Sequence, residues 1–331
     1  MSSSETNNNN ILITGAAGQL GVELTTRLIE LHGVDKVIAT DIREPAHCET
    51  TGTQNGIAEQ AGSVRFEYLD VLDYQSLSEV INRHDIDTVY HLAAILSAKG
   101  EQQIEATWNL NINGLLNVLE LGRTGQIDHI FWPSSIAVFG PDAPRTATPQ
   151  NAPLNPTTVY GISKVAGEQW CSYYFRRFGV DVRSLRYPGL IGWISEPGGG
   201  TTDYAVDMLR SAYHGNFFEC PLNTDTHLPM MIMDDAVKAA LDVMSVDTND
   251  VGIRTSYNVT SMHFSPRQLG EAIRQHNKEF QIEYKPDARD EIARSWPDSI
   301  DDQPARTDWG WKPSFDLEAM VRGFFEQKFA R

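Results

Sequence analysis

The sequence predicts an α/β fold: a Rossmann-type, doubly wound parallel sheet with a smaller C-terminal substrate-binding lobe. Short apolar runs alternate with amphipathic stretches up to Arg186, which is the pattern of parallel strands joined by helices. A glycine-rich turn follows the first apolar run, and the alternation weakens after Arg186. The length of 331 residues exceeds the usual range of one hydrophobic core and favours two parts.

Six apolar runs are the expected strands of the main sheet, at residues 11–13, 37–39, 64–69, 88–92, 129–132 and 182–185. Helical patterns separate most of them, at residues 19–31, 74–83, 104–121 and 159–178. This alternation implies a sheet covered by helices on both faces. The polar, glycine-rich residues 43–62 are expected to form a surface loop.

The remaining chain predicts two short strands and four helices. The strands are expected at 230–233 and 256–259, and the helices at 205–213, 234–244, 266–276 and 317–325. The glycine-rich turn indicates a nucleotide-binding domain over 10–186, joined by parts of 229–260. Residues 187–228 and 261–331 would form the substrate-binding lobe, and residues 1–9 a disordered leader.

Composition excludes several classes of protein. The net charge of −17 repels nucleic acid and anionic lipid, so neither is an expected partner. Three scattered cysteines without CxxC spacing (Cys48, Cys171 and Cys220) favour a reducing compartment and argue against a disulfide framework or a zinc site. No signal peptide or long apolar run is present, so we expect a soluble, cytoplasmic protein without a metal.

The segment from Gly15 to Gly21 has the pattern of a dinucleotide-binding turn. Gly15 permits the tight turn, Gly18 lets the backbone approach a pyrophosphate, and Gly21 lets helix and strand pack closely. Gln19 and Leu20 begin the helix, whose N-terminus supplies amide donors and a positive dipole end to phosphates.

Asp41 lies about 20 residues beyond the turn, at the end of the second expected strand, where its carboxylate can accept hydrogen bonds from the adenosine ribose diol. It would repel a 2′-phosphate, so we expect NAD rather than NADP, although Arg43 nearby is able to pair with a phosphate. The ends of the next two strands complete the expected cofactor site, at Asp70, Val71, Leu92, Ala93 and Ala94.

Tyr160 and Lys164 form a YxxxK pair at the start of a helix, where residues four apart share one face. A free tyrosine has a pKa near 10 and is a poor base at neutral pH. A neighbouring ammonium and the positive charge of oxidised nicotinamide both stabilise the phenolate. The pair therefore indicates acid–base chemistry beside a nicotinamide.

Polar side chains near this pair complete the expected catalytic group. Ser134 and Ser135 follow an expected strand at the edge where parallel-strand enzymes place their sites, and one of them is expected to bind the substrate hydroxyl. Asn111 lies among apolar residues of a helix and needs a partner. That partner is either backbone or a water leading to Lys164.

These motifs resemble those of the extended short-chain dehydrogenase/reductase family. The matching segments are TGAAGQLG (14–21), HLAA (91–94), NINGLLNVLE (111–120), SSIAVFG (134–140), YGISK (160–164) and RYPGLIG (186–192). The family's active-site serine lies five residues before the glycine of its V-[YF]-G element, which maps onto Ser135. The resemblance implies that Tyr160 is the base and that Lys164 grips the nicotinamide ribose. It also implies that Leu190 meets the nicotinamide through its backbone.

Within this family the chain resembles the short-chain-type L-threonine 3-dehydrogenases, through FWPSSIAVFGP (131–141), TTVYGISKVAGEQWC (157–171), PGGGTTDYAVD (197–207) and SWPDSIDD (295–302). The resemblance implies oxidation of the Cβ hydroxyl of L-threonine to 2-amino-3-oxobutanoate by NAD, in a homodimer. Ser97, Thr201 and Thr202 would contact threonine. Gly198–Gly200 would let their loop close, and Trp296 and Asp298 would either fold over the substrate or pack the lobe.

Sugar-nucleotide epimerases and dehydratases share this fold, so the fold does not choose among these activities. Epimerases usually carry an asparagine where this chain has Pro188-Gly189, and dehydratases carry acidic residues where Ile136 follows Ser135. A diphosphate-bearing substrate calls for basic residues, yet 187–230 contains only Arg210. A non-catalytic redox sensor is the alternative from another class, and it often lacks the tyrosine–lysine pair.

Overall fold

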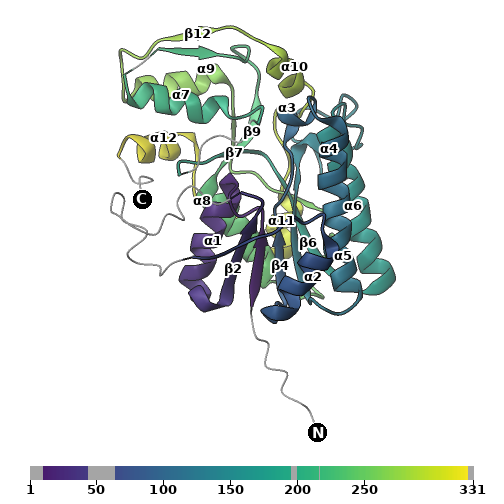
Figure 1. Ribbon diagram of the computed structural model, residues 1–331. Coiled ribbons are helices and arrows are strands. Elements are labelled where there is room, and N and C mark those ends of the chain that lie inside the picture. Colours follow the sequence, from purple (N-terminus) through teal and green to yellow (C-terminus); the bar gives the residue numbers. More distant parts are fainter. Residues whose placement is uncertain (1–9, 44–63, 195–199, 216, 327–331) are drawn as a thin grey trace.

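The computed structural model describes residues 10–43, 64–194, 200–215 and 217–326. The expected leader, most of the expected 43–62 loop with Cys48, and Gly198 and Gly199 of the expected lid lie outside these ranges. The fold is a seven-stranded parallel sheet with helices on both faces and a smaller part beside it (Figure 1), which confirms the predicted fold class.

The large sheet has the order β10-β6-β5-β4-β1-β2-β3, and all its strand pairs are parallel. Its strands are β1 (Ile11–Thr14), β2 (Val37–Asp41), β3 (Arg65–Tyr68), β4 (Thr88–His91), β5 (His129–Ser135), β6 (Asp181–Tyr187) and β10 (Tyr257–Asn258). From β1 the chain proceeds outward through β2 and β3, then returns to β4 on the other side of β1. The carboxyl edge beside this switch point is where open α/β sheets bind their ligands.

Helices cover both faces of the large sheet (Figure 1). On one face, α1 (Gln19–His32) and α8 (Met233–Ser245) bury Leu24, Leu28 and Ala240 against the strands. On the other, α2 (Tyr74–Arg83), α5 (Gly114–Arg123) and α6 (Val159–Phe178) enclose a second apolar core. Strands buried on both faces read as continuous apolar runs, which is why they were recognisable in the sequence.

Within the described residues, the smaller part contains two short sheets and four helices. Its strands are β7 (Gly189–Ile191), β9 (Leu228–Ile232) and β11 (Met262–Phe264) in the order β11-β9-β7, and β8 (Phe218–Cys220) beside β12 (Ile282–Tyr284). Its helices are α7 (Tyr204–Tyr213), α9 (Pro266–Arg274), α10 (Ala288–Arg294) and α12 (Leu317–Phe325). Across the described residues, no helix is both long enough and apolar enough to cross a membrane.

The range 104–121, expected to be helical, is helical throughout, with a change of helix geometry in its middle. The structure has α3 (Ser97–Gly100) and α4 (Ile104–Trp108), then a π-helical turn at Asn109–Asn113 that leads into α5. The wider turn carries Asn111, whose side chain bonds outside its own helix. The remaining short elements are α11 (Gln303–Trp309) and 3₁₀ turns at Val34–Lys36 and Ile136–Val138.

Candidate active site

The glycine turn after β1 is packed so tightly that side chains would not fit. Gly15 has a φ of +72°, and a Cβ there would lie 2.6 Å from the backbone nitrogen of Ala93. A Cβ on Gly21 would lie 2.4 Å from the carbonyl oxygen of Gly15. The turn, the N-terminus of α1 and the segment after β4 therefore form one close-packed backbone cradle.

Asp41 ends β2 with its carboxylate beside this cradle. It accepts hydrogen bonds from the backbone N–H groups of Ala17, at 3.1 Å, and Arg43, at 3.0 Å. The Arg43 side chain is exposed, and its Nε lies 3.8 Å from the carboxylate. Asp41 thus fixes the glycine turn and stands at the strand end where a ribose diol would be bound.

The neighbouring groups fit a dinucleotide. The Nε2 amide of Gln19, at the start of α1, is buried and has no hydrogen-bond partner. The backbone N–H of Leu92 is taken by the Thr14 carbonyl, and the carbonyl of Val71 accepts from Asn117. Asp70 closes its own turn by accepting from the backbone N–H of Leu72. An orphaned amide beside a cradle built of glycines and alanines is suited to a pyrophosphate.

Tyr160 and Lys164 lie in the first two turns of α6. The hydroxyl of Thr158 accepts from the Gly161 N–H and caps the helix, which fixes where Tyr160 leaves the backbone. The Lys164 ammonium is buried and donates to the carbonyl of Pro133 at 2.6 Å. It lies 4.4 Å from the centre of the Trp132 ring and 5.6 Å from that of Tyr160.

The two adjacent serines at the end of β5 have different surroundings. The Ser135 hydroxyl faces the Tyr160 phenol, whose pKa it lowers, and it accepts from the Ala137 N–H at 3.2 Å. The Ser134 hydroxyl donates to Glu168 at 2.7 Å and is buried. Successive side chains of a strand leave on opposite faces. Ser135 therefore contacts the tyrosine, whereas Ser134 is engaged in the protein interior and does not reach it.

Burial controls the ionisation of the tyrosine–lysine pair. It raises the pKa of Tyr160 to about 12, while the Ser135 hydroxyl acts in the opposite direction. It lowers the pKa of Lys164 to about 7, against the effects of Cys171 and Glu168. Both shifts favour the uncharged forms. The protein alone therefore keeps the phenol protonated, and a base role for Tyr160 requires further positive charge nearby.

Both the oxygen and the nitrogen of the Asn111 side-chain amide form hydrogen bonds with other protein groups. Its Oδ1 accepts from the Ile95 N–H at 2.9 Å, and its Nδ2 donates to the Ile95 carbonyl and the Ser163 hydroxyl, both at 3.1 Å. The Ser163 hydroxyl in turn donates to the Tyr160 carbonyl. Of the two expected partners, the structure shows the backbone one. Asn111 connects the segment after β4 with the start of α6.

The expected substrate residues Ser97 and Thr201 meet across the two parts of the molecule. Their hydroxyl oxygens are 3.2 Å apart and both side chains are buried. Thr202 packs closely on Gly189, where a Cβ would lie 2.6 Å from its methyl group. Leu190 follows on β7 and is partly buried. The sequence segments around 97, 190 and 201 thus converge beside the β5–α6 pair.

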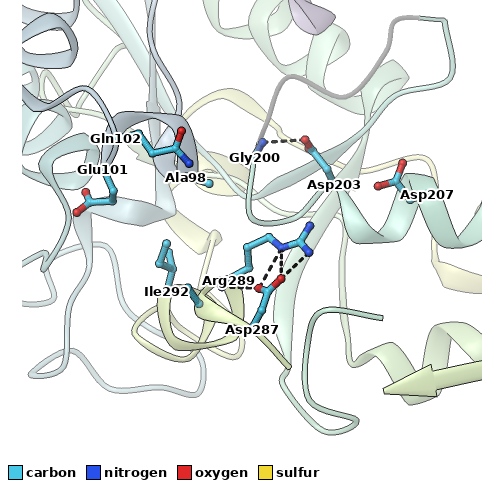
Figure 2. Close-up of a pocket in the computed structure, with 10 residues that line it drawn as sticks. Ala98, Glu101, Gln102, Gly200, Asp203, Asp207, Asp287, Arg289 and Ile292 are labelled. Atoms are coloured by element: carbon cyan, nitrogen blue, oxygen red, sulfur yellow. Dashed lines mark hydrogen bonds and ion pairs between the residues drawn. The ribbon is translucent and has the colours of Figure 1, made fainter. Parts of the chain in front are cut away.

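A cavity of about 670 Å³ opens next to this meeting point (Figure 2). It is lined by Ala98, Glu101, Gln102, Gly200, Asp203, Asp207, Asp287, Ala288, Arg289 and Ile292. Tyr160 and the glycine turn are not among its walls. Ala98 and Gly200 of its lining are the sequence neighbours of Ser97 and Thr201, whereas Ser97 and Thr201 are not among its walls. The cavity therefore adjoins the candidate site and is not the site itself.

Trp296 and Asp298 had two expected roles, and the structure shows the packing one. Trp296 is buried in the apolar cluster that also contains Tyr160 and Ile300. Asp298 pairs with Arg145, with a closest approach of 2.5 Å. Neither side chain is free to fold over a substrate in this arrangement.

Two buried groups escaped the sequence analysis. His91 bonds the Thr14 hydroxyl through Nδ1, and burial lowers its pKa to about 3. Its position in HLAA, at the end of an apolar strand, was the available signal. Glu168 is fully buried and pairs with Arg186. No local spacing in the sequence links Glu168 with Arg186, because the two residues lie on different elements.

Among the described residues, no cluster suited to a metal ion was found.

Comparisons with known proteins agree with this geometry. The model of the NAD dependent epimerase/dehydratase family matches residues 11–259. An uncharacterized epimerase/dehydratase of Staphylococcus aureus strain MRSA252 is 44% identical over 317 residues, covering 96% of this chain and 95% of that protein. The structure is also similar to the holo form of a GalE-like L-threonine dehydrogenase from Cupriavidus necator, with 47% identity and a TM-score of 0.90, covering 96% and 99% of the two chains. It is similar as well to a monomeric L-threonine 3-dehydrogenase from a metagenome database, with 46% identity and a TM-score of 0.89, covering 96% of this chain and 98% of that one.

Proposed function

The chain belongs to the NAD dependent epimerase/dehydratase family, and on that premise we propose that it oxidises the Cβ hydroxyl of L-threonine to 2-amino-3-oxobutanoate. NAD is the cofactor, and the chain is an NAD-dependent oxidoreductase. The observation that carries the proposal is the group formed by Ser135, Tyr160 and Lys164 beside the cradle at Gly15. The relatives named as L-threonine dehydrogenases support the choice of substrate.

In this proposal the parallel sheet and its helices hold NAD. The cradle from Gly15 to Gly21, with Gln19, receives the pyrophosphate, and Asp41 receives the adenosine ribose. Asp70, Val71, Leu92, Ala93 and Ala94 border the rest of the dinucleotide, and Leu190 meets the nicotinamide. Residues 187–228 and 261–331 are assigned to the substrate-binding lobe.

Tyr160 acts as the general base and Ser135 orients the substrate hydroxyl. As the Tyr160 oxygen takes the hydroxyl proton, the bond between Cβ and its hydrogen breaks and a carbonyl forms. NAD, when bound, accepts that hydrogen as a hydride and supplies a positive charge before the transfer. Lys164 adds the second positive charge that the buried phenol needs, and its ammonium would hold the nicotinamide ribose.

Ser97, Thr201 and Thr202 are proposed to hold the amino acid part of threonine. The bond between Ser97 and Thr201 keeps two hydroxyl groups together at the boundary of the two parts. Hydroxyl groups are able to donate to a carboxylate and to accept from an ammonium. The absence of a basic cluster over 187–230 favours this small zwitterion over a nucleotide sugar.

The proposal is tested by following NADH formation with a panel of L-threonine, L-serine, L-allo-threonine and UDP-sugars, without added metal. We expect reduction of NAD with L-threonine and much less with the other compounds. Activity on a UDP-sugar and none on threonine would keep the fold and the cofactor but overturn the substrate.

A further inference from the structure

A buried polar network lies beneath the candidate site and involves none of the reacting groups. Glu168 is fully buried on α6 and accepts three hydrogen bonds: from Ser134 at 2.7 Å and from Arg186 at 2.8 and 2.7 Å. Arg186 also donates to the Gln150 carbonyl and the Asn258 amide. The network therefore joins α6 to β5, β6, β10 and the loop that carries Gln150.

Three consecutive residues at the end of β5 contact α6, and the network supplies the middle one of these contacts. Pro133 accepts from Lys164, Ser134 donates to Glu168, and Ser135 contacts Tyr160. Lys164 and Glu168 are four residues apart and share a face of α6. A slip of β5 relative to α6 would thus misplace the Ser135 hydroxyl and remove the acceptor of Lys164 together.

Glu168 also acts on Lys164 through its charge. Its carboxylate opposes the effect of burial on the pKa of Lys164, which burial brings to about 7. The other titratable groups around this ammonium are Tyr160 and Cys171 on α6 and His91 on β4. Arg186 faces Glu168 from β6. Because a buried anion next to a cation favours its charged form, loss of the carboxylate leaves Lys164 more often neutral.

We propose that Glu168, held by Ser134 and Arg186, is a positioning residue for the dehydrogenase reaction: it keeps Lys164 charged and keeps Ser135 directed at Tyr160. This inference rests on the proposed function for its kinetic consequence. The charge state of Lys164 is a property of the protein alone and does not depend on the substrate.

The test is Glu168→Gln, which removes the charge and retains the shape. Labelling lysines with carbon-13 at Cε lets the Lys164 signal, assigned by its loss in Lys164→Met, be titrated without cofactor or substrate. We expect the midpoint of Lys164 at lower pH in Glu168→Gln than in the wild type. We also expect a kcat for threonine at least about tenfold lower with little change in KM, and an acidic limb of the kcat profile moved to higher pH.

Two further variants separate the charge from the geometry. Ser134→Ala keeps the ion pair and is expected to lower kcat severalfold without moving the Lys164 midpoint. It tests the geometric part even where Glu168→Gln does not fold. Asp235→Asn removes another buried carboxylate, bonded to Ser261 and the backbone of Ser314, and controls for lost stability.

An unchanged Lys164 midpoint in folded Glu168→Gln would overturn the charge role, whatever the activity. Equal kcat in Ser134→Ala and the wild type would overturn the geometric role. A wild-type protein that is inactive on threonine would instead contradict the proposed function, while the titration would still decide whether Glu168 controls Lys164.

Discussion

At the scale of single residues, neighbours in sequence have different tasks because the backbone turns them apart. Ser134 and Ser135 are adjacent residues of the same type at the end of β5, yet Ser134 donates to Glu168 and Ser135 faces Tyr160. From the sequence, both serines could be placed at the end of the correct strand. Which of them faces Tyr160 could not be predicted, because the orientation of each side chain depends on partners far along the chain. The mechanism therefore assigns the substrate hydroxyl to Ser135 alone.

Tyr160→Phe tests the proposed base. Removing the hydroxyl deletes the proton acceptor but keeps the ring in its buried place, so NAD binding should be nearly unchanged. Turnover of threonine should fall at least about 100-fold, the usual scale for loss of acid–base catalysis. Steady-state kinetics and a fluorescence titration with NAD measure the two effects. Turnover near that of the wild type would remove Tyr160 as the base.

Asp41→Ala tests which ribose the site is built for. The carboxylate stands at the end of β2 and would repel a 2′-phosphate, so its loss should weaken NAD more than NADP. Arg43→Ala is the matched control, because Arg43 is exposed at the same strand end and its loss should change NAD affinity little. Equal weakening of both cofactors in Asp41→Ala would mean that the carboxylate does not contact the ribose.

At the scale of elements, the π-helical turn at Asn109–Asn113 connects two parts of the site. Asn111 bonds both backbone groups of Ile95 and the Ser163 hydroxyl. It thereby ties the segment that leads to Ser97 to the helix that carries Tyr160. The sequence predicted a helix over 104–121 but not this turn within it, because apolar spacing does not reveal a single extra residue in a turn.

Asn111→Ala should loosen the substrate side of the site more than the chemistry. It leaves two partly buried backbone groups of Ile95 without their Asn111 partner, which costs about 1 kcal/mol of stability. We expect a higher KM for threonine and a smaller change in kcat. Asn113→Ala, in the same turn but exposed and bonded only to Asn109, should change neither. A large fall in kcat at unchanged KM would argue instead for a role in proton transfer.

Long or strongly patterned elements were predictable, whereas short ones were not. The helices Tyr74–Arg83 and Val159–Phe178 were predicted with the bounds that the structure has, because capping residues and apolar periodicity agree there. Strands β7, β8, β11 and β12 have three residues each and were missed. Three residues are too few to show alternation, and their pairing depends on the tertiary structure.

At the scale of the whole molecule, an exposed apolar band runs along α4 and α6, which pack against each other. It contains Ile104 and Trp108 on α4 and Ile162, Trp170 and Tyr173 on α6. The two tryptophans are 43% and 38% exposed, and aromatic residues are enriched in protein interfaces. If the chain forms the homodimer expected from its sequence, we expect this band to be the contact between the two copies.

Trp170→Glu should separate such a dimer, because a charge at the centre of an apolar contact is buried without a partner. Light scattering coupled to size-exclusion chromatography gives the mass of each species. Leu31→Glu, at an exposed position on α1, is the control and should stay dimeric. A wild-type protein of monomer mass would contradict the inference and would match the monomeric relative described above.

The central claim is that the hydrogen on Cβ of L-threonine leaves as a hydride to NAD while Tyr160 takes the hydroxyl proton. The most direct test is incubation of the wild-type protein with L-threonine carrying deuterium at Cβ, followed by mass spectrometry of the NADH formed. The account predicts one deuterium transferred to the nicotinamide ring for each 2-amino-3-oxobutanoate produced. NADH without deuterium, or no NADH from threonine, would contradict it.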